Sequence, residues 1–269
     1  MDRIILTGAI NFHYFAGFGG GRKIQSVCMT SLETIRSNHK LSVSGKNGSF
    51  HEKVAPGILD GNPVHEDMME ITRFREPDFL LNVVLDDDGK LLKCFAGNYK
   101  SAHEAGCKYI CESRMISIKH PVDLVIAGCG GYPFDVNFIQ SHKTMDFSCR
   151  VLKEGGSVIL IAACSEGIGN PNFLQWFEQN PDYKSFRESV AINYQLNGHT
   201  ALATFVKSKK FNLKMFTKLS GNDLHTMNIN KIDDINKTVK DSTANLSSDG
   251  KIIAIPNGHA ILPVCSIPQ

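Results

Sequence analysis

The densest group of residues able to do chemistry lies near the start of the chain. It runs from His13 past four glycines to Arg22 and Lys23, and a second histidine, His39, follows after a short polar segment. Glycine allows backbone N–H groups to approach a bound group closely. Histidine and lysine supply proton transfer, metal ligation and positive charge in small-molecule sites. The segment 13–39 is therefore the first candidate site.

Three interpretations of this string can be compared. A Walker A phosphate loop requires glycine directly before its lysine and Ser or Thr directly after it, whereas Arg22 precedes Lys23 and Ile24 follows. A dinucleotide fingerprint fits Gly17 and Gly19 only if its third glycine is dropped. A solvated glycine turn beside a core histidine stays open, because residue types and spacing alone do not separate it from a cofactor loop.

The string resembles the signature of the nickel-dependent lactate racemase family. That signature is a histidine, then A-G-F-S-G-G-R-K, then T-I and N-H after a short helix. The spacings agree with the family, with ten residues from His13 to Lys23 and sixteen from Lys23 to His39. The matching residues are His13, Ala16-Gly17-Phe18-Gly19-Gly20-Gly21-Arg22-Lys23, Thr34-Ile35 and Asn38-His39, and further similar blocks span residues 61–67, 81–85 and 130–143.

The resemblance implies an isomerase, a racemase or epimerase of a 2-hydroxy acid, that uses nickel in a nickel–pincer nucleotide. In this mechanism hydride leaves the α-carbon for the cofactor and returns on either face. Lys23 matches the lysine that tethers the cofactor through a thioamide, and His39 matches the histidine that completes the nickel coordination. His13 matches one of two acid/base histidines. Gln140 and Lys143 match residues that hold the substrate carboxylate.

Several neighbouring residues are left out of this site. Arg22 fits either a charge directed at the cofactor or an ordinary surface residue. Residues 65–67, His-Glu-Asp, look like a metal triad, but adjacent helical positions point in different directions, so a capping or surface role is expected. His142 should face away from Lys143 if both lie on one helix.

The match departs from the family pattern in three places. Gly19 stands where the family favours serine, and Val27-Cys28 stands where it has Pro-Gly. Complete members carry a further N-terminal stretch with an Asp–Arg motif and the second catalytic histidine, and neither precedes Met1 here. We therefore expect an incomplete racemase. The alternative is a non-catalytic or truncated homologue that retains the cofactor-binding loop.

The elements that position these residues indicate an α/β fold. We expect two α/β domains, the first incomplete and the second with a Rossmann-like parallel sheet, because strand and helix patterns alternate after residue 120. The predicted domains are 1–115 and 116–245, with a strand in 246–269 returning to the first. The predicted strands are 4–10, 79–85, 90–95, 122–129, 157–163 and 251–258. The predicted helices are 31–39, 65–74, 101–111, 137–153, 172–177 and 201–207. Residues 41–63 are predicted to form a loop, and 211–219 is an ambiguous strand.

The composition of the chain limits the classes of partner that are expected. The chain has 269 residues, 42% of them hydrophobic, which suffices for two domains. Its 29 basic and 27 acidic residues are dispersed, which disfavours nucleic acid. Eight scattered cysteines without C-x2-C spacing indicate reduced thiols in the cytoplasm, and the first apolar run is too short for a membrane span. The expected partners are a small 2-hydroxy acid, the cofactor-biosynthesis enzymes and the missing N-terminal segment.

Overall fold

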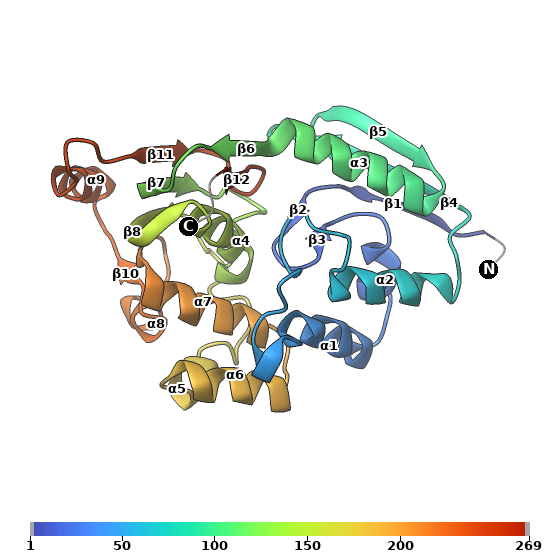
Figure 1. Ribbon diagram of the computed structural model, residues 1–269, viewed down its shortest axis with the longest axis horizontal. Helices are drawn as coiled ribbons and strands as arrows, with labels where there is room; N and C mark the ends of the chain where they lie inside the picture. The colour runs from blue at the N-terminus through green and yellow to red at the C-terminus, as the bar shows by residue number, and fades with distance from the viewer. Residues whose placement is uncertain (1–2, 267–269) are drawn as a thin grey trace. The chain divides into compact units, whose positions relative to one another are not determined.

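The computed structural model describes residues 3–266, and its chain divides into two compact units (Figure 1). The first unit runs up to Met115 and also takes in Ala191–Leu196, and the second contains the remainder. The predicted ranges 1–115 and 246–269 include residues 1–2 and 267–269, which lie outside the described residues.

A three-stranded mixed sheet supports the first unit. Strand β1 (Ile5–Ala9) runs parallel to β4 (Phe79–Leu85), which pairs antiparallel with β5 (Leu91–Gly97). The predicted 79–95 hairpin is therefore confirmed. Helix α3 (Tyr99–Arg114) packs on β4 and β5, as Figure 1 shows. The buried apolar residues of this core are Leu6, Met69, Leu80, Tyr99 and Ala102.

Side-chain caps set the helix starts in this unit. Ser31 accepts the N–H of Thr34 and begins α1 (Leu32–Lys40). Asn62 caps α2 (Pro63–Arg73), whose first residue is proline, and Asn98 caps α3. The predicted loop between α1 and α2 holds two short 3₁₀ turns, Leu41–Val43 and Lys46–Gly48. Before α1 come the two-residue strands β2 (Phe12–His13) and β3 (Gly17–Phe18) and a π-helical turn, Ile24–Cys28.

The second unit contains a five-stranded, all-parallel sheet in the order β10-β9-β8-β7-β11. Residues 124–127 and 158–161 of its central strands are continuous apolar runs, as is typical of parallel sheets. The Rossmann-like prediction is confirmed. The strands are β7 (Val122–Gly128), β8 (Leu152–Ile161), β9 (Asn212–Phe216), β10 (Asn230–Lys231) and β11 (Ile252–Ile255).

Helices connect these strands, and several were not predicted. Helix α4 (Phe138–Cys149) lies between β7 and β8 in the chain and packs on both. It ends before residue 153 because β8 already begins at Leu152. The other helices are α5 (Gln175–Gln179), α6 (Tyr183–Ile192), α7 (Gly198–Lys210), α8 (Gly221–Thr226) and α9 (Ile235–Ala244), of which α6, α8 and α9 were missed.

The end of the chain differs from expectation. The strand predicted to return to the first domain is β11, and it pairs with β7 in parallel register, Ile252 opposite Leu124. An apolar β11 satisfies the backbone of β7 on the side away from β8, which a four-stranded sheet would leave open. A last strand, β12 (Leu262–Cys265), pairs with β6 (Met115–Ile118).

All eight cysteines are free thiols. In residues 3–266 no helix is long and apolar enough to cross a membrane.

Candidate active site

Three of the four glycines before Lys23 lie where a side chain would be strained or would collide with a neighbour. Strands β2 and β3 pair His13 with Gly17, and a side chain at Gly17 would collide with the carbonyl oxygen of Ile58. Gly20 and Gly21 both have positive φ, +71° and +52°. At Gly21 a Cβ would lie 2.6 Å from Cδ2 of His103. Because larger residues are excluded, the loop can lie directly over α3.

Arg22 is a buried residue beneath the loop. Its side chain is 1% exposed, so the surface role left open above is wrong. Nη2 donates to the carbonyl oxygen of Ala16 at 2.8 Å, and Nη1 donates to that of Phe18 at 2.9 Å. Nη1 also lies 3.1 Å from Nε2 of His103, which is 3.0 Å from the carbonyl oxygen of Gly19. The guanidinium therefore fixes the curvature of the loop that presents Lys23.

Two buried asparagines join the loop to the surrounding elements. Asn82 on β4 accepts the N–H of Gly21 at 2.9 Å and donates to the carbonyl oxygen of Gly8 at 3.1 Å. Asn62, the cap of α2, donates to the carbonyl oxygen of Phe15 at 3.0 Å. Both residues belong to blocks that resemble the family, but these roles cannot be predicted from the sequence, because a buried asparagine looks like a turn residue until its partners are known.

His13 lies inside this hairpin, 7% exposed. Its Nδ1 accepts the N–H of Ala16 at 3.3 Å, and its ring meets that of Phe15 edge-on with centroids 4.5 Å apart. Because Nδ1 is the acceptor, the neutral ring carries its proton on Nε2. His13 is thus a potential proton donor held by its own loop.

His39, at the end of α1, packs against the same phenylalanine. Its ring centroid is 4.8 Å from that of Phe15. Burial, and then the positive charge of Lys23, lower the pKa of His39 to about 4. The ring is therefore neutral at physiological pH, the state required for metal ligation. His13 and His39 therefore both pack against Phe15, and Lys23 lies close enough to His39 to lower its pKa.

Lys23 is partly exposed and precedes the π-helical turn Ile24–Cys28. Such turns are rare and often occur at functional sites. Arg22 points beneath the loop, while the charge of Lys23 acts on His39. Arg22 therefore holds the backbone of the loop, whereas the neighbouring Lys23 acts on His39.

Gln140 and Lys143 lie in the second unit, on the first turns of α4. Asn137 caps this helix by accepting the N–H of Gln140 at 3.0 Å. Nζ of Lys143 donates to Oε1 of Gln140 at 2.6 Å, and burial lowers the pKa of Lys143 to about 8. The helix follows β7, where the strand order reverses because β11 lies on the far side of β7. Ligands bind at this position in open parallel sheets.

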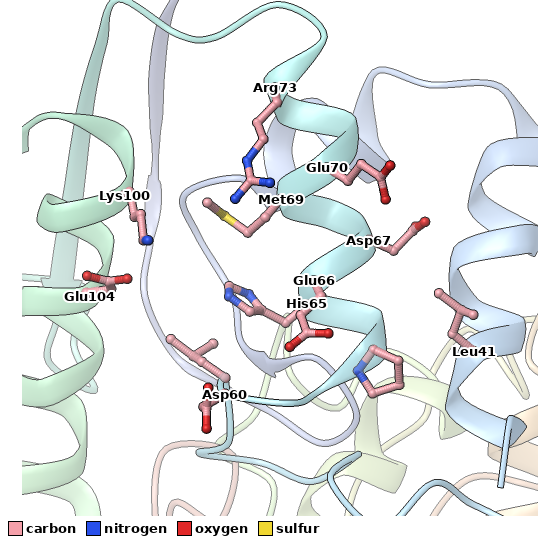
Figure 2. Close-up of a pocket in the computed structure, with 12 residues that line it drawn as sticks. Leu41, Asp60, His65, Glu66, Asp67, Met69, Glu70, Arg73, Lys100 and Glu104 are labelled. Carbon is pink, nitrogen blue, oxygen red and sulfur yellow. The ribbon is translucent and has the colours of Figure 1, made fainter.

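Two histidines near predicted site residues have other roles. His142 is fully buried, and its pKa is lowered to about 3, chiefly by burial. His65 lines a hollow of about 780 Å³ between α2 and α3 (Figure 2). In Figure 2 His65 points away from Asp67, so residues 65–67 do not converge as a triad. The hollow is polar and carries more acidic than basic side chains, and Lys23, His13 and His39 are not among its lining residues.

The side chains at the loop fit a metal ion that is already bound by an organic group. Among residues 3–266 no group of three or more His, Cys, Asp or Glu side chains could hold a metal ion. One neutral imidazole next to a lysine, above a glycine loop, suits a metal already chelated by an organic group.

Known proteins that resemble this chain identify its family. The family model of the lactate racemase C-terminal domain matches residues 118–263, and that of the lactate racemase N-terminal domain matches residues 1–50. A lactate racemase of Thermoanaerobacterium thermosaccharolyticum is 29% identical over 278 aligned positions, which cover 97% of this chain and 61% of that protein. One from Lactiplantibacillus plantarum is 36% identical over 194 positions, covering 71% of this chain and 44% of that protein.

Solved structures give the same result. The lactate racemase apoprotein of T. thermosaccharolyticum superimposes with a TM-score of 0.87 at 29% identity, covering 97% of this chain and 63% of that one. A Thermotoga maritima protein shares the fold, with a TM-score of 0.69 at 17% identity, covering 99% of this chain and 67% of that one. The chain thus spans about three fifths of the T. thermosaccharolyticum relative that it matches along nearly its whole length. Because the C-terminal family model alone covers more than half of the sequence, the chain belongs to the lactate racemase family.

Proposed function

We propose that this protein takes part in the racemisation or epimerisation of a 2-hydroxy acid with a nickel–pincer nucleotide attached to Lys23. The observation that carries the proposal is the packing of His13 and a neutral His39 against Phe15, with the charge of Lys23 acting on His39. The relatives are named lactate racemases, which makes lactate the first substrate to assay.

Each residue has a separate task. When bound, the cofactor supplies an acceptor and donor of hydride. Lys23 holds it covalently, and His39 ligates nickel through a neutral imidazole nitrogen. Lys143, whose pKa of about 8 leaves it largely protonated at neutral pH, holds the substrate carboxylate as a point charge. Gln140, already hydrogen-bonded to Lys143, adds a polar contact.

His13 handles the proton of the substrate oxygen. With Nδ1 as acceptor, the neutral ring can donate a hydrogen bond from Nε2 to the substrate oxygen. Uptake of the hydroxyl proton requires the other neutral tautomer, with the hydrogen on Nδ1 and Nε2 free; this ring becomes an imidazolium and returns the proton from Nε2 as the hydroxy acid is restored. A planar 2-oxo acid has two faces, and the family resemblance assigns them to a pair of histidines, of which His13 is one.

The test is covalent loading of Lys23. The protein is co-expressed with the cofactor-biosynthesis enzymes, and intact and peptide masses are measured with nickel content. We expect a cofactor adduct on Lys23, no adduct in Lys23→Ala, and a normal adduct in the control Lys40→Ala, which changes an exposed lysine at the end of α1. An unmodified Lys23, or an adduct that persists in Lys23→Ala, contradicts the proposal.

Turnover is measured on the same preparations with D- and L-lactate. Interconversion that requires Lys23 supports the enzyme. Loading without interconversion of any 2-hydroxy acid supports the alternative, a homologue that binds the cofactor without catalysis.

A further inference from the structure

We propose that Asn38 and Asp67 are positioning residues that fix the proton of His39 on Nδ1 and so direct the lone pair of Nε2 to the metal. A hydrogen-bond chain runs from the carboxylate of Asp67 through the amide of Asn38 to the imidazole. The role in nickel binding rests on the proposed function above. The position of the proton does not, because it follows from the partners of Asn38.

The orientation of the Asn38 amide is determined by two acceptors. Its Nδ2 lies 3.0 Å from the carbonyl oxygen of Val64 and 2.8 Å from Oδ2 of Asp67. A backbone carbonyl and a carboxylate accept hydrogen bonds and donate none, so the NH₂ group must face them. A flipped amide would place two acceptors against the Asn38 oxygen, in a side chain that is 0% exposed. Oδ1 of Asn38 therefore faces His39.

The tautomer of His39 follows directly. Oδ1 of Asn38 is 3.1 Å from Nδ1 of His39, and an amide oxygen can only accept. Nδ1 must carry the hydrogen. In the neutral ring, the form that ligates metals, Nε2 is then the unprotonated nitrogen. This arrangement, a ligand histidine whose other nitrogen donates to a fixed acceptor, is the one that metal sites use to set ring orientation and to raise ligand basicity.

The two helices that carry the chain are themselves held in place. Asp67 projects from α2 toward α1 (Figure 2), and Asn38 lies in the last turn of α1. The start of α2 is fixed by Asn62, which also donates to the carbonyl oxygen of Phe15, the residue that both site histidines pack against. The carboxylate, the amide and the imidazole thus belong to one rigid arrangement.

The first experiment determines the tautomer without any cofactor. Long-range ¹H–¹⁵N NMR of the histidine rings distinguishes Nδ1–H from Nε2–H, and the His39 signals are assigned by their loss in His39→Gln. We expect Nδ1–H in the parent protein and in Asp67→Asn, and loss of the pure Nδ1–H form in Asn38→Leu. A parent ring protonated on Nε2, or an Asn38→Leu protein that retains Nδ1–H, would overturn the inference. A role in packing alone would not move this signal.

The second experiment measures nickel retention on protein loaded as above, as nickel per Lys23 adduct during competition with EDTA. We expect retention to weaken by about 10-fold to 100-fold in Asn38→Leu, and to a smaller extent in Asp67→Asn. Glu70→Gln is the matched control, since it neutralises another carboxylate of α2 outside the chain, and it should retain nickel as the parent does.

The failures of the two proposals are distinguishable. Absence of the adduct from the parent overturns the proposed function but leaves the tautomer result in place. An adduct with equal nickel retention in all variants overturns the role of Asn38 and Asp67. If Asn38→Leu does not fold, Asp67→Asn against Glu70→Gln still decides the role in nickel retention, and the parent spectrum still decides the tautomer.

Discussion

Arg22 shows how a single residue gives the cofactor loop its shape. It is a buried cation that, within residues 3–266, forms no ion pair, and its hydrogen bonds go to carbonyl oxygens and to a histidine. Burial lowers its pKa to about 10, which still leaves it charged at neutral pH. Such a charge is tolerated only because several dipoles of the loop point at it. The loop and Arg22 therefore depend on each other.

Replacing Arg22 should destabilise the first unit. We expect Arg22→Met to lower the free energy of unfolding by about 2–4 kcal/mol, because the carbonyl groups of Ala16 and Phe18 lose charge-assisted bonds and stay buried. Urea denaturation followed by circular dichroism measures the change. Arg36→Met, on the exposed side of α1, is the control and should stay within about 0.5 kcal/mol of the parent. Equal effects of the two substitutions would show that the loop does not need its buried cation.

At the scale of single elements, the starts of α2 and α3 differ in how their capping residues are used. Asn62 and Asn98 both cap helices with Oδ1. Asn98 is exposed and its side chain does little else, whereas Asn62 is fully buried and also donates to the carbonyl oxygens of Phe15 and Ile58. The same residue type therefore has a local role in α3 and a tertiary role in α2.

This contrast predicts unequal costs for the same substitution. Asn98→Ala should cost about 1 kcal/mol, the usual effect of losing an N-cap. Asn62→Ala should cost about 3 kcal/mol, because two further hydrogen bonds are lost in a buried place. Thermal and urea unfolding of both variants provide the comparison. If Asn62→Ala lowered the free energy of unfolding no more than Asn98→Ala, the hydrogen bond from Asn62 to Phe15 would not contribute to stability.

At the scale of the whole molecule, buried histidines couple the stability of both units to pH. Burial is the largest cause of the low pKa values of His103 in the first unit and His142 in the second, each about 3 against an ordinary 6.5. Between pH 3 and pH 6.5 these histidines therefore bind protons in the unfolded chain but not in the folded one. The stabilisation is therefore complete above pH 6.5 and is lost as the pH falls toward 3.

The second unit offers a clean measurement, because Trp176 is the only tryptophan of the chain. We expect its unfolding free energy, followed by Trp176 fluorescence, to fall by about 1.4 kcal/mol per pH unit for each such proton as the pH drops below 6.5. His142→Gln should make this dependence shallower. An unchanged slope in that variant would mean that His142 is protonated in the folded protein.

The sequence alone determined the local features of this protein. Alternation and turn residues identified the 79–95 hairpin, apolar runs identified β7 and β8, and the resemblance of the string from His13 through Lys23 to His39 to a known signature pointed to the loop and the family. These signals are short-range, so they survive without knowledge of the fold.

The tertiary structure decided which polar residues are buried and what they bind. The sequence does not indicate whether Arg22 or Asn38 faces water or a carbonyl group, because their hydrogen-bond partners lie elsewhere in the chain. The same reason explains why β11 was assigned to the wrong unit, since strand pairing with β7 is set by the sheet. Sequence therefore named Lys23 and His39, and only the fold revealed how Arg22, Asn38 and Asp67 hold them.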